Sequence, residues 1–292
     1  MGKLISFQRL ETPGYVEPEW QAGEVALVGA GPGDPGLLTL RAYHLMQQAD
    51  VVVFDRLVSA DIMAMVTSKA TRIDAGKSCK KHVLTQDRTN EVLVEQARMG
   101  KKVLRLKGGD PYIFGRGGEE VEVLIAAGIR FRVVPGITSA QGCTTYAGFP
   151  LTHRDYAQSV TFVTGHRQSS AEDSDGREAL DLNWKSLATS AHTVVFYMGL
   201  GNAETITTEM IRAGRASSTP VALIERGTRP EQRTVITDLL SMPEAIIRNS
   251  LQPPTMIVVG EVVAIARQQT IQDNDLVPGI EFHQEDSTRL RL

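Results

Sequence analysis

The most chemically distinctive segment of the chain is LKGGDPYIFGRGGEE, at residues 106–120. Gly108 and Gly109 follow an apolar run, and paired glycines allow a backbone to approach a ligand closely. Asp110 offers a carboxylate to hydroxyl or ammonium groups, and Arg116, flanked by glycines, can present its guanidinium without neighbouring bulk. The spacing therefore predicts a ligand-binding loop, with a plain strand–turn–helix connection as the alternative.

A second glycine cluster, GAGPGD at residues 29–34, lies between a predicted strand and a predicted helix, as a dinucleotide-binding fingerprint would. The match is incomplete, because Asp34 takes the place of the third glycine and would repel a pyrophosphate. Pro32 also removes one backbone donor. Asp50 and Asp55 lie at about the sequence distance of a ribose-binding acid, so NAD binding stays an alternative, as does a purely structural turn. The pattern favours a loop that some other ligand approaches closely.

Both glycine clusters lie at the ends of short apolar runs that alternate with amphipathic stretches. This alternation predicts an α/β fold with a largely parallel sheet, and such sheets bind ligands at the carboxyl ends of their strands. The expected strands of this half are residues 24–29, 50–54, 102–106 and 130–134, and the expected helices are 37–49, 86–98 and 115–127.

A second set of strands and helices follows the stretch 135–152, which contains two prolines and three glycines and within which we expect a hinge at residues 137–150. The expected strands are 160–164, 193–197, 220–224, 234–237 and 255–259, with a helix over 202–212. The predicted organisation is two α/β domains, 24–136 and 151–266, between an N-terminal extension (1–23) and a polar tail (267–292). The sequence suggests no role for the acidic loop 169–183.

Composition and charge narrow the class of protein. With 292 residues, 42% hydrophobic and 22% charged, the chain is typical of a globular protein of one large or two medium domains. The net charge of −3 argues against a general nucleic-acid binder. Two cysteines, Cys79 and Cys143, are too few for a disulfide framework or a four-thiolate zinc site. No signal peptide and no membrane-spanning run is evident, so we expect a cytoplasmic protein with no membrane partner.

Seven blocks of the sequence, in order, closely resemble the uroporphyrinogen-III C-methyltransferases of the tetrapyrrole methylase family. The blocks are VGAGPGDPGLLTL (28–40), VVFDRLVS (52–59), RLKGGDPYIFGRGGEE (105–120), VVPGITSAQGC (133–143), GFPLTHRDYAQSV (148–160), VTGH (163–166) and VFYMGL (195–200). One block alone would be weak, but seven in the family's order make chance similarity improbable. The resemblance runs from about residue 25 to 264 and spans both expected domains.

The resemblance implies a definite reaction. S-adenosylmethionine gives a methyl group to a β-carbon on each of two neighbouring pyrrole rings of uroporphyrinogen III, which yields precorrin-2 and two S-adenosylhomocysteines. It also implies two α/β domains with the active site in the cleft between them, a homodimer, and no metal. The end product (sirohaem, cobalamin or another modified haem such as haem d1) stays open. The length leaves no room for an additional dehydrogenase–ferrochelatase domain, so we expect a stand-alone enzyme.

Three alternatives to this reaction remain. A tetrapyrrole methylase acting on a later corrinoid intermediate is the nearest, although such relatives commonly lack the THRDY and FGRGGEE combination found here. An NAD-dependent oxidoreductase would change nicotinamide absorbance and transfer no methyl group. A non-catalytic regulator would bind the ligand without turnover.

The resemblance also implies roles for single residues. Asp55 is expected to abstract a proton and Lys77 to donate one, while Arg116 with Glu119 forms a further pair near the reacting ring. Arginine is too weak a base at neutral pH, so we favour carboxylate binding for Arg116, with Glu119 orienting its guanidinium. The substrate carries eight carboxylates, which arginine binds well; the expected substrate-binding residues are Arg56, Arg116, His153 and Arg154. The expected cofactor-binding residues are Pro32, Gly108, Gly109, Asp110, Ile113, Thr138, Ser139, Met198 and Gly227.

Overall fold

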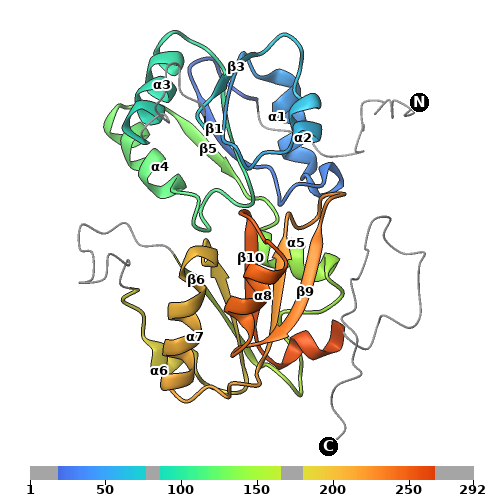
Figure 1. Cartoon of the computed structure of the whole chain (residues 1–292). Coiled ribbons are helices and arrows are strands. Elements are labelled where there is room, and N and C mark those ends of the chain that lie inside the picture. Colours follow the sequence, from blue (N-terminus) through green and yellow to red (C-terminus); the bar gives the residue numbers. More distant parts are fainter. Residues whose placement is uncertain (1–18, 77–85, 166–179, 267–292) are drawn as a thin grey trace, which may run out of the picture.

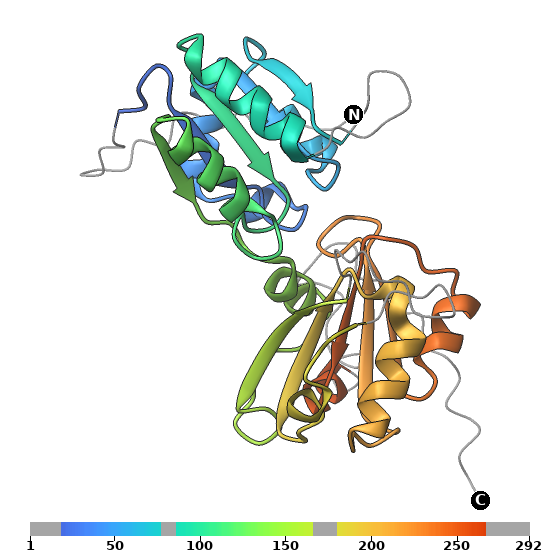
Figure 2. The same ribbon diagram turned by 90° about the vertical axis from the view of Figure 1, so that its left-hand side faces the viewer.

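The computed structural model describes residues 19–76, 86–165 and 180–266. Lys77, Cys79, the tail 267–292, and most of the extension 1–23 and of the acidic loop 169–183 lie outside these ranges. Within them the chain forms two five-stranded sheets, one above the other in Figure 1 and Figure 2, each flanked by helices. The fold is mixed α/β, as the sequence predicts.

The first sheet is parallel throughout and has the strand order β3-β2-β4-β1-β5. Every residue of β1 and β4 is buried, because helices cover both faces of the sheet. The register pairs Gly29 with Lys107 and Phe54 with Leu106, so the carboxyl ends of the three central strands meet at one edge. The strands are β1 (Val25–Gly29), β2 (Val51–Phe54), β3 (Thr71–Asp74), β4 (Val103–Lys107) and β5 (Phe131–Val134).

Two pairs of helices enclose this sheet (Figure 1). Helices α1 (Leu40–Gln48) and α2 (Ala60–Ala64) bury apolar side chains in a cluster on one face, while α3 (Gln86–Arg98) and α4 (Gly117–Ala126) do so on the other. A single turn, η1 (Pro35–Leu37), precedes α1. The bounds of α3 agree with those predicted. Helix α4 begins two residues later than predicted, because Arg116 before it has a left-handed backbone (φ 58°).

The second sheet is mostly antiparallel, with the order β6-β7-β10-β8-β9. Only β6 and β7 pair in parallel, and the other three pairs run in opposite directions. Strands β8 and β9 are joined by residues 226–232 alone, and so short a connection favours a hairpin. The parallel arrangement predicted from the first half therefore does not extend to the second. Its strands are β6 (Ser159–Thr164), β7 (His192–Tyr197), β8 (Pro220–Glu225), β9 (Arg233–Asp238) and β10 (Thr255–Val259).

Helices also cover both faces of the second sheet. Helices α6 (Trp184–Leu187), α7 (Ala203–Arg212) and α8 (Met242–Arg248) contribute to the apolar cluster on one face, and η3 (Glu261–Ile265) to that on the other. A short turn, η2 (Leu200–Asn202), leads from β7 into α7. Among the described residues, no helix has the length and apolar character needed to cross a bilayer.

Helix α5 (Ser139–Tyr146) lies within the stretch 137–150 that the sequence predicts as a hinge. Its Ala140 and Cys143 are buried in the same cluster as Val195 and Ile224 of the second sheet. The segment SAQGCTTY escaped the prediction because its small and β-branched residues carry no apolar helical period. Packing places α5 with the second half, and the exact domain boundaries stay a proposal.

Candidate functional site

The two glycine clusters singled out in the sequence lie side by side at the carboxyl edge of the first sheet. The backbone amide of Gly109 donates to the carbonyl of Gly31 at 2.7 Å, and the amide of Gly31 donates to the carbonyl of Gly109 at 3.1 Å. A Cβ on Gly136, just after β5, would overlap the Gly109 carbonyl oxygen. Three loops therefore approach one another as closely as only glycine permits.

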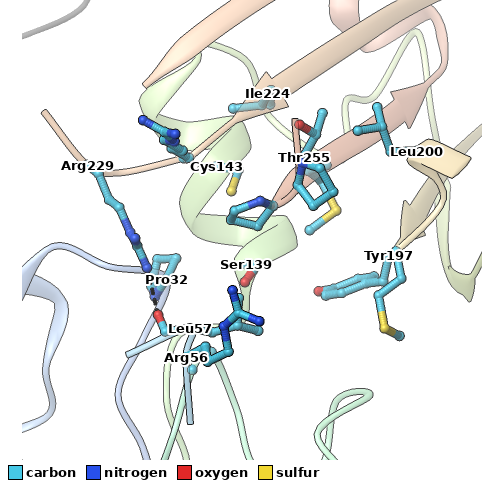
Figure 3. A pocket seen from close by; sticks show the side chains of 18 of the residues that line it. Pro32, Arg56, Leu57, Ser139, Cys143, Tyr197, Leu200, Ile224, Arg229 and Thr255 are labelled. Atoms are coloured by element: carbon cyan, nitrogen blue, oxygen red, sulfur yellow. Dashed lines mark hydrogen bonds between the residues drawn. The ribbon is translucent and has the colours of Figure 1, made fainter. Parts of the chain in front are cut away.

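A cavity of about 620 Å³ lies between these loops and the second half of the chain (Figure 3). Its volume is within the range of about 300–1,000 Å³ that is usual for small-molecule sites. Pro32, Arg56 and Leu57 line it from the first half, whereas Tyr197 and Ile224 line it from the second. The predicted residues found in its lining are Pro32, Arg56, Gly108, Gly109, Ser139, Met198 and Gly227.

The loops around the cavity hold side-chain-bearing residues in left-handed backbone conformations. Met198 has φ 55°, Arg226 has φ 49° and Thr228 has φ 67°, and Phe114 and Arg116 in the neighbouring loop have φ 51° and 58°. Such residues are uncommon outside glycine and cost about 1–3 kcal/mol each in the strained cases. Their concentration around one cavity points to a functional constraint there.

Cys143 on α5 forms part of the cavity floor and packs directly beneath Gly227. A Cβ on Gly227 would overlap the Cys143 sulfur, so the loop after β8 can pass this close to α5 only with glycine at position 227. Burial raises the pKa of the Cys143 thiol to about 12. The thiol therefore stays protonated at neutral pH and serves as a packing group rather than a nucleophile.

Asp34, which the sequence suggested would repel a pyrophosphate, joins the two halves of the chain. Its backbone amide donates to the Thr228 hydroxyl at 3.2 Å, and its Oδ2 accepts from the Tyr146 hydroxyl at 2.5 Å. Nearby, the Arg229 guanidinium donates to the Leu57 carbonyl at 2.7 Å (Figure 3). These polar contacts hold the loop after β8 against the loops of the first sheet.

We expect Tyr146→Phe to lower the free energy of unfolding by about 1 kcal/mol at pH 7, because a partly buried hydrogen bond to a carboxylate is lost. Burial, and then the bond to Asp34, raise the pKa of Tyr146 from 10.0 to about 12. The stabilisation is therefore complete below pH 10 and disappears as the pH rises to about 12. Urea unfolding of both proteins across this range checks the prediction. Tyr112→Phe, at an exposed tyrosine, is the control. A loss of unfolding free energy in Tyr146→Phe that did not change with pH would contradict the prediction.

Tyr197 closes one end of the cavity at the carboxyl end of β7 (Figure 3). Its hydroxyl lies 2.5 Å from the Thr138 hydroxyl and accepts from the Ala140 amide at 3.1 Å. The Phe114 ring packs against it with 4.8 Å between centroids. Tyr197 thus connects the loop 110–116 and the start of α5 to the second sheet.

Asp110 and Ile113 lie next to the cavity lining rather than in it. Asp110 accepts hydrogen bonds from the amides of Tyr112 at 2.8 Å and Gly136 at 3.0 Å, so its carboxylate shapes the glycine loop. Ile113 packs on the apolar cluster of the second half.

Arg116 and Glu119 form a two-pronged ion pair on the exposed side of α4. The guanidinium Nε and Nη2 lie 2.8 and 2.6 Å from the two carboxylate oxygens. The hydrogen bond from Arg116 lowers the pKa of Glu119 below its ordinary value, and that of Arg116 is raised. The carboxylate is therefore ionised at neutral pH and fixes the direction of the guanidinium.

Asp55 directly follows β2, at the same sheet edge as the glycine loops. Its Oδ1 accepts from the Leu57 amide at 3.0 Å, and its Oδ2 lies 3.8 Å from the Arg105 guanidinium. The neighbouring Arg56 lines the cavity. Lys77, its expected partner in proton transfer, is outside the described residues.

His153 and Arg154 belong to a tight turn that is not part of the cavity lining. His153 and Ala157 exchange two backbone hydrogen bonds of 3.0 and 2.9 Å, and the His153 ring lies 4.8 Å from that of Tyr156. The Arg154 side chain is exposed. The structure does not bring these two residues together with the cavity.

The lining residues that sequence reasoning missed include Tyr197, Arg226 and Arg229, whose side chains are aromatic or cationic. The sequence did contain a signal for the two arginines. The segment RGTR (226–229) follows a predicted strand and places cations beside a glycine, as RGG (116–118) does. Nothing local distinguished Tyr197 from a core aromatic residue, because it ends an apolar strand.

A family model for tetrapyrrole (corrin/porphyrin) methylases matches residues 24–243. A siroheme synthase of Psychromonas ingrahamii is 55% identical over 88% of this chain and 52% of its own length. A siroheme synthase of Pseudomonas entomophila is 56% identical over 85% of this chain and 52% of its own length. The chain thus spans about half the length of the curated relatives it matches.

Two kinds of solved structure are similar over most of the chain. A uroporphyrin-III C-methyl transferase from Thermus thermophilus, in complex with S-adenyl homocysteine, has a TM-score of 0.70 and 37% identity. The similarity covers 83% of this chain and 94% of that protein. A cobalt precorrin-4 methyltransferase has a TM-score of 0.70 and 27% identity, covering 82% of this chain and 96% of that one.

Proposed function

The chain belongs to the tetrapyrrole (corrin/porphyrin) methylase family, and from that premise we propose that it is an S-adenosylmethionine-dependent C-methyltransferase of uroporphyrinogen III. It methylates two neighbouring pyrrole rings and forms precorrin-2, through precorrin-1, with two molecules of S-adenosylhomocysteine. The observation that carries the proposal is the similarity over 94% of a uroporphyrin-III C-methyl transferase whose structure holds S-adenyl homocysteine.

The cavity suits S-adenosylmethionine in both size and lining. Its walls combine apolar side chains such as Pro32, Leu57 and Ile224 with exposed glycine backbone, the mixture typical of nucleoside-containing ligands. When bound, this cofactor supplies a methyl group on a positively charged sulfur. The residues that we propose to hold it are Pro32, Gly108, Gly109, Asp110, Ile113, Thr138, Ser139, Met198 and Gly227.

The protein's main contribution to the transfer is position, because the donor is already activated. The Thr138–Tyr197 hydrogen bond and the Arg229–Leu57 hydrogen bond hold the cavity walls at a fixed separation. An active site between the two halves would then be lined from both sides and shielded from water.

A base is also needed, because the methylated macrocycle keeps a positive charge until it releases a proton. Asp55 is the proposed acceptor: its carboxylate takes the proton, and the electron pair of the broken bond stays in the macrocycle. Lys77 is the proposed proton donor elsewhere in the cycle. Arg116, fixed by Glu119, is proposed to bind a substrate carboxylate close to the reacting ring.

Cationic side chains are expected to receive the acetate and propionate arms of the substrate. Arg56 is the proposed contact in the cavity lining, and Arg116, His153 and Arg154 are the proposed contacts outside it. The planar guanidinium binds a carboxylate through two parallel hydrogen bonds, which favours the arginines in this role.

Methylation of a later corrinoid intermediate is the second candidate function. It is supported by the similarity to cobalt precorrin-4 methyltransferase, whose TM-score equals that of the uroporphyrin-III enzyme. The lower identity, 27% against 37%, favours the uroporphyrinogen substrate.

The proposal includes a homodimer, with no nucleic acid or membrane as partner, and a cytoplasmic location. The dimer follows from the family resemblance, and sedimentation of the purified protein tests it. The free thiol of Cys143 suits a reducing compartment.

The activity is tested by incubating the purified protein anaerobically with uroporphyrinogen III and methyl-labelled S-adenosylmethionine. We expect two labelled methyl groups per macrocycle and a matching amount of S-adenosylhomocysteine. A precorrin-4-type substrate run in parallel tests the second candidate. Absence of label from uroporphyrinogen III, with the protein folded and binding S-adenosylhomocysteine, would overturn the proposal.

A further inference from the structure

A cluster of buried charged side chains lies beneath the loop that carries Asp55. Its centre is Glu120 on α4, which is 0% exposed. Glu120 accepts hydrogen bonds from Arg105 Nε at 2.9 Å and from Lys107 Nζ at 2.9 and 3.0 Å. Both cations come from β4, and Gln86 of α3 adds a bond of 3.3 Å. None of these four residues was singled out from the sequence.

Stability alone gives no reason for this cluster. Removing charges from water costs several kcal/mol per ion, and apolar replacements of buried ion pairs are often neutral or stabilising. Apolar side chains surround the cluster on the same face of the sheet, among them Val53, Val92 and Leu93. A polar arrangement that the core does not need indicates a task at the sheet edge.

Asp55 lies at the edge of the cluster. Arg105 and Lys107 both donate to Glu120, and Asp55 Oδ2 lies 3.8 Å from Arg105 Nη2. Burial acts to raise the pKa of Glu120, but the two cations hold it below its ordinary value, so Glu120 is ionised and pairs with both. Arg105 therefore lies between two carboxylates, one buried and one at the strand end.

Among the described residues, Arg105 is the cation nearest to Asp55. Arg56, on the same loop, lines the cavity, and Asp74 ends the neighbouring strand β3. Lys107 bonds both oxygens of Glu120, and burial followed by the nearby Arg105 lowers its pKa. Arg105 alone makes contact with both carboxylates.

We propose that Arg105 is a positioning residue that orients the Asp55 carboxylate for proton abstraction, and that Glu120 with Lys107 holds Arg105 in place. The inference rests on the proposed function, because the cationic methylated ring is what requires a base. With Oδ1 fixed by the Leu57 amide and Oδ2 facing Arg105, the carboxylate has one orientation at the strand end. Glu120 acts through Arg105 and touches no substrate.

The proposal is tested by measuring kcat and KM separately for methyl transfer in Arg105→Met. Loss of a group that orients the base should lower kcat by about 10- to 100-fold, because small misplacements of a catalytic group are costly. The KM for uroporphyrinogen III and the affinity for S-adenosylhomocysteine should stay unchanged. A merely structural role would lower the fraction of folded, cofactor-binding protein and leave the kcat of that fraction unchanged.

Two further variants keep the test decisive. Arg105→Lys retains a cation and should keep kcat closer to that of the unmodified enzyme than Arg105→Met does. Arg105→Gln removes the charge but can still donate to Glu120, and it gives the same reading as Arg105→Met if that variant fails to fold. Folding is checked by thermal unfolding and by binding of S-adenosylhomocysteine.

Glu24→Gln is the matched control. Glu24 is nearly buried and forms a two-pronged ion pair with Arg132 at 2.6 and 3.0 Å, but it precedes β1, at the opposite edge of the sheet. Its loss should lower stability without changing kcat. An unchanged kcat in folded Arg105→Met or Arg105→Gln would overturn the inference. Lack of methyl transfer by the unmodified protein would instead overturn the proposed function.

Discussion

Asp55→Asn is expected to lower kcat for methylation of uroporphyrinogen III by about 10²–10⁴-fold, the usual contribution of a positioned general base. Asparagine has nearly the same shape and can still accept from the Leu57 amide at 3.0 Å, so the loop should keep its conformation. It cannot take a proton at neutral pH. Affinity for S-adenosylhomocysteine should be unchanged, because Asp55 is not in the lining of the cavity.

Single-turnover experiments measure the rate of methyl transfer, and calorimetric titration separately measures the affinity for S-adenosylhomocysteine. Asp50→Asn is the matched control, because Asp50 precedes the same strand and its carboxylate accepts from the Lys102 amide at the opposite edge of the sheet. That variant should turn over normally. If Asp55→Asn kept its full kcat, proton abstraction would have to be assigned to another residue.

Arg116→Ala is expected to lower kcat/KM for methylation of uroporphyrinogen III by about 100-fold or more. Hydrogen bonds to charged groups contribute about 1.5–3 kcal/mol each, and a substrate carboxylate can take two from one guanidinium. Glu119 occupies Nε and Nη2, which leaves the other N–H groups of Arg116 for the substrate. Cofactor binding should remain nearly intact, because Arg116 does not line the cavity.

Two variants separate the charge of Arg116 from its backbone. Arg116→Gly removes the side chain and also relieves the left-handed backbone at φ 58°, so lost activity there cannot arise from strain. Arg88→Ala removes another exposed arginine, on α3, that pairs with Glu91 and Glu95. It should leave turnover unchanged. Normal kcat/KM in Arg116→Ala would remove Arg116 from the site.

Elements with a strong local pattern were predicted well from the sequence. Helix α3 shows apolar residues at helical spacing between polar ones, and β10 is a short apolar run, and both have the predicted bounds. The direction of strand pairing in the second sheet could not be predicted in this way, because it depends on contacts between distant segments. Helix α5 was missed because it is stabilised by packing against the second sheet rather than by its own sequence.

The candidate site shows the same division. Glycine clusters at strand ends predicted the side of the cavity that the first half forms, because only glycine allows the backbones to approach so closely there. The resemblance pointed to Glu119, yet the neighbouring Glu120 is the buried one. Only the helical phase of α4 decides between them, because it turns Gly117, Glu120 and Leu124 inward, and no local sequence pattern specifies that phase.

The route of the chain through the cavity walls sets an order of events during synthesis. The first sheet has all its strands once residue 134 has been made, and its apolar clusters contain residues of that half alone. The cavity also needs the loop after β8 and residues 253–256, which are synthesised long after that half. Domains fold as units during synthesis, the N-terminal one first. The nascent first half therefore has to rely on its own core for protection from proteolysis and aggregation, because the ligand has nowhere to bind until the second half has also been made.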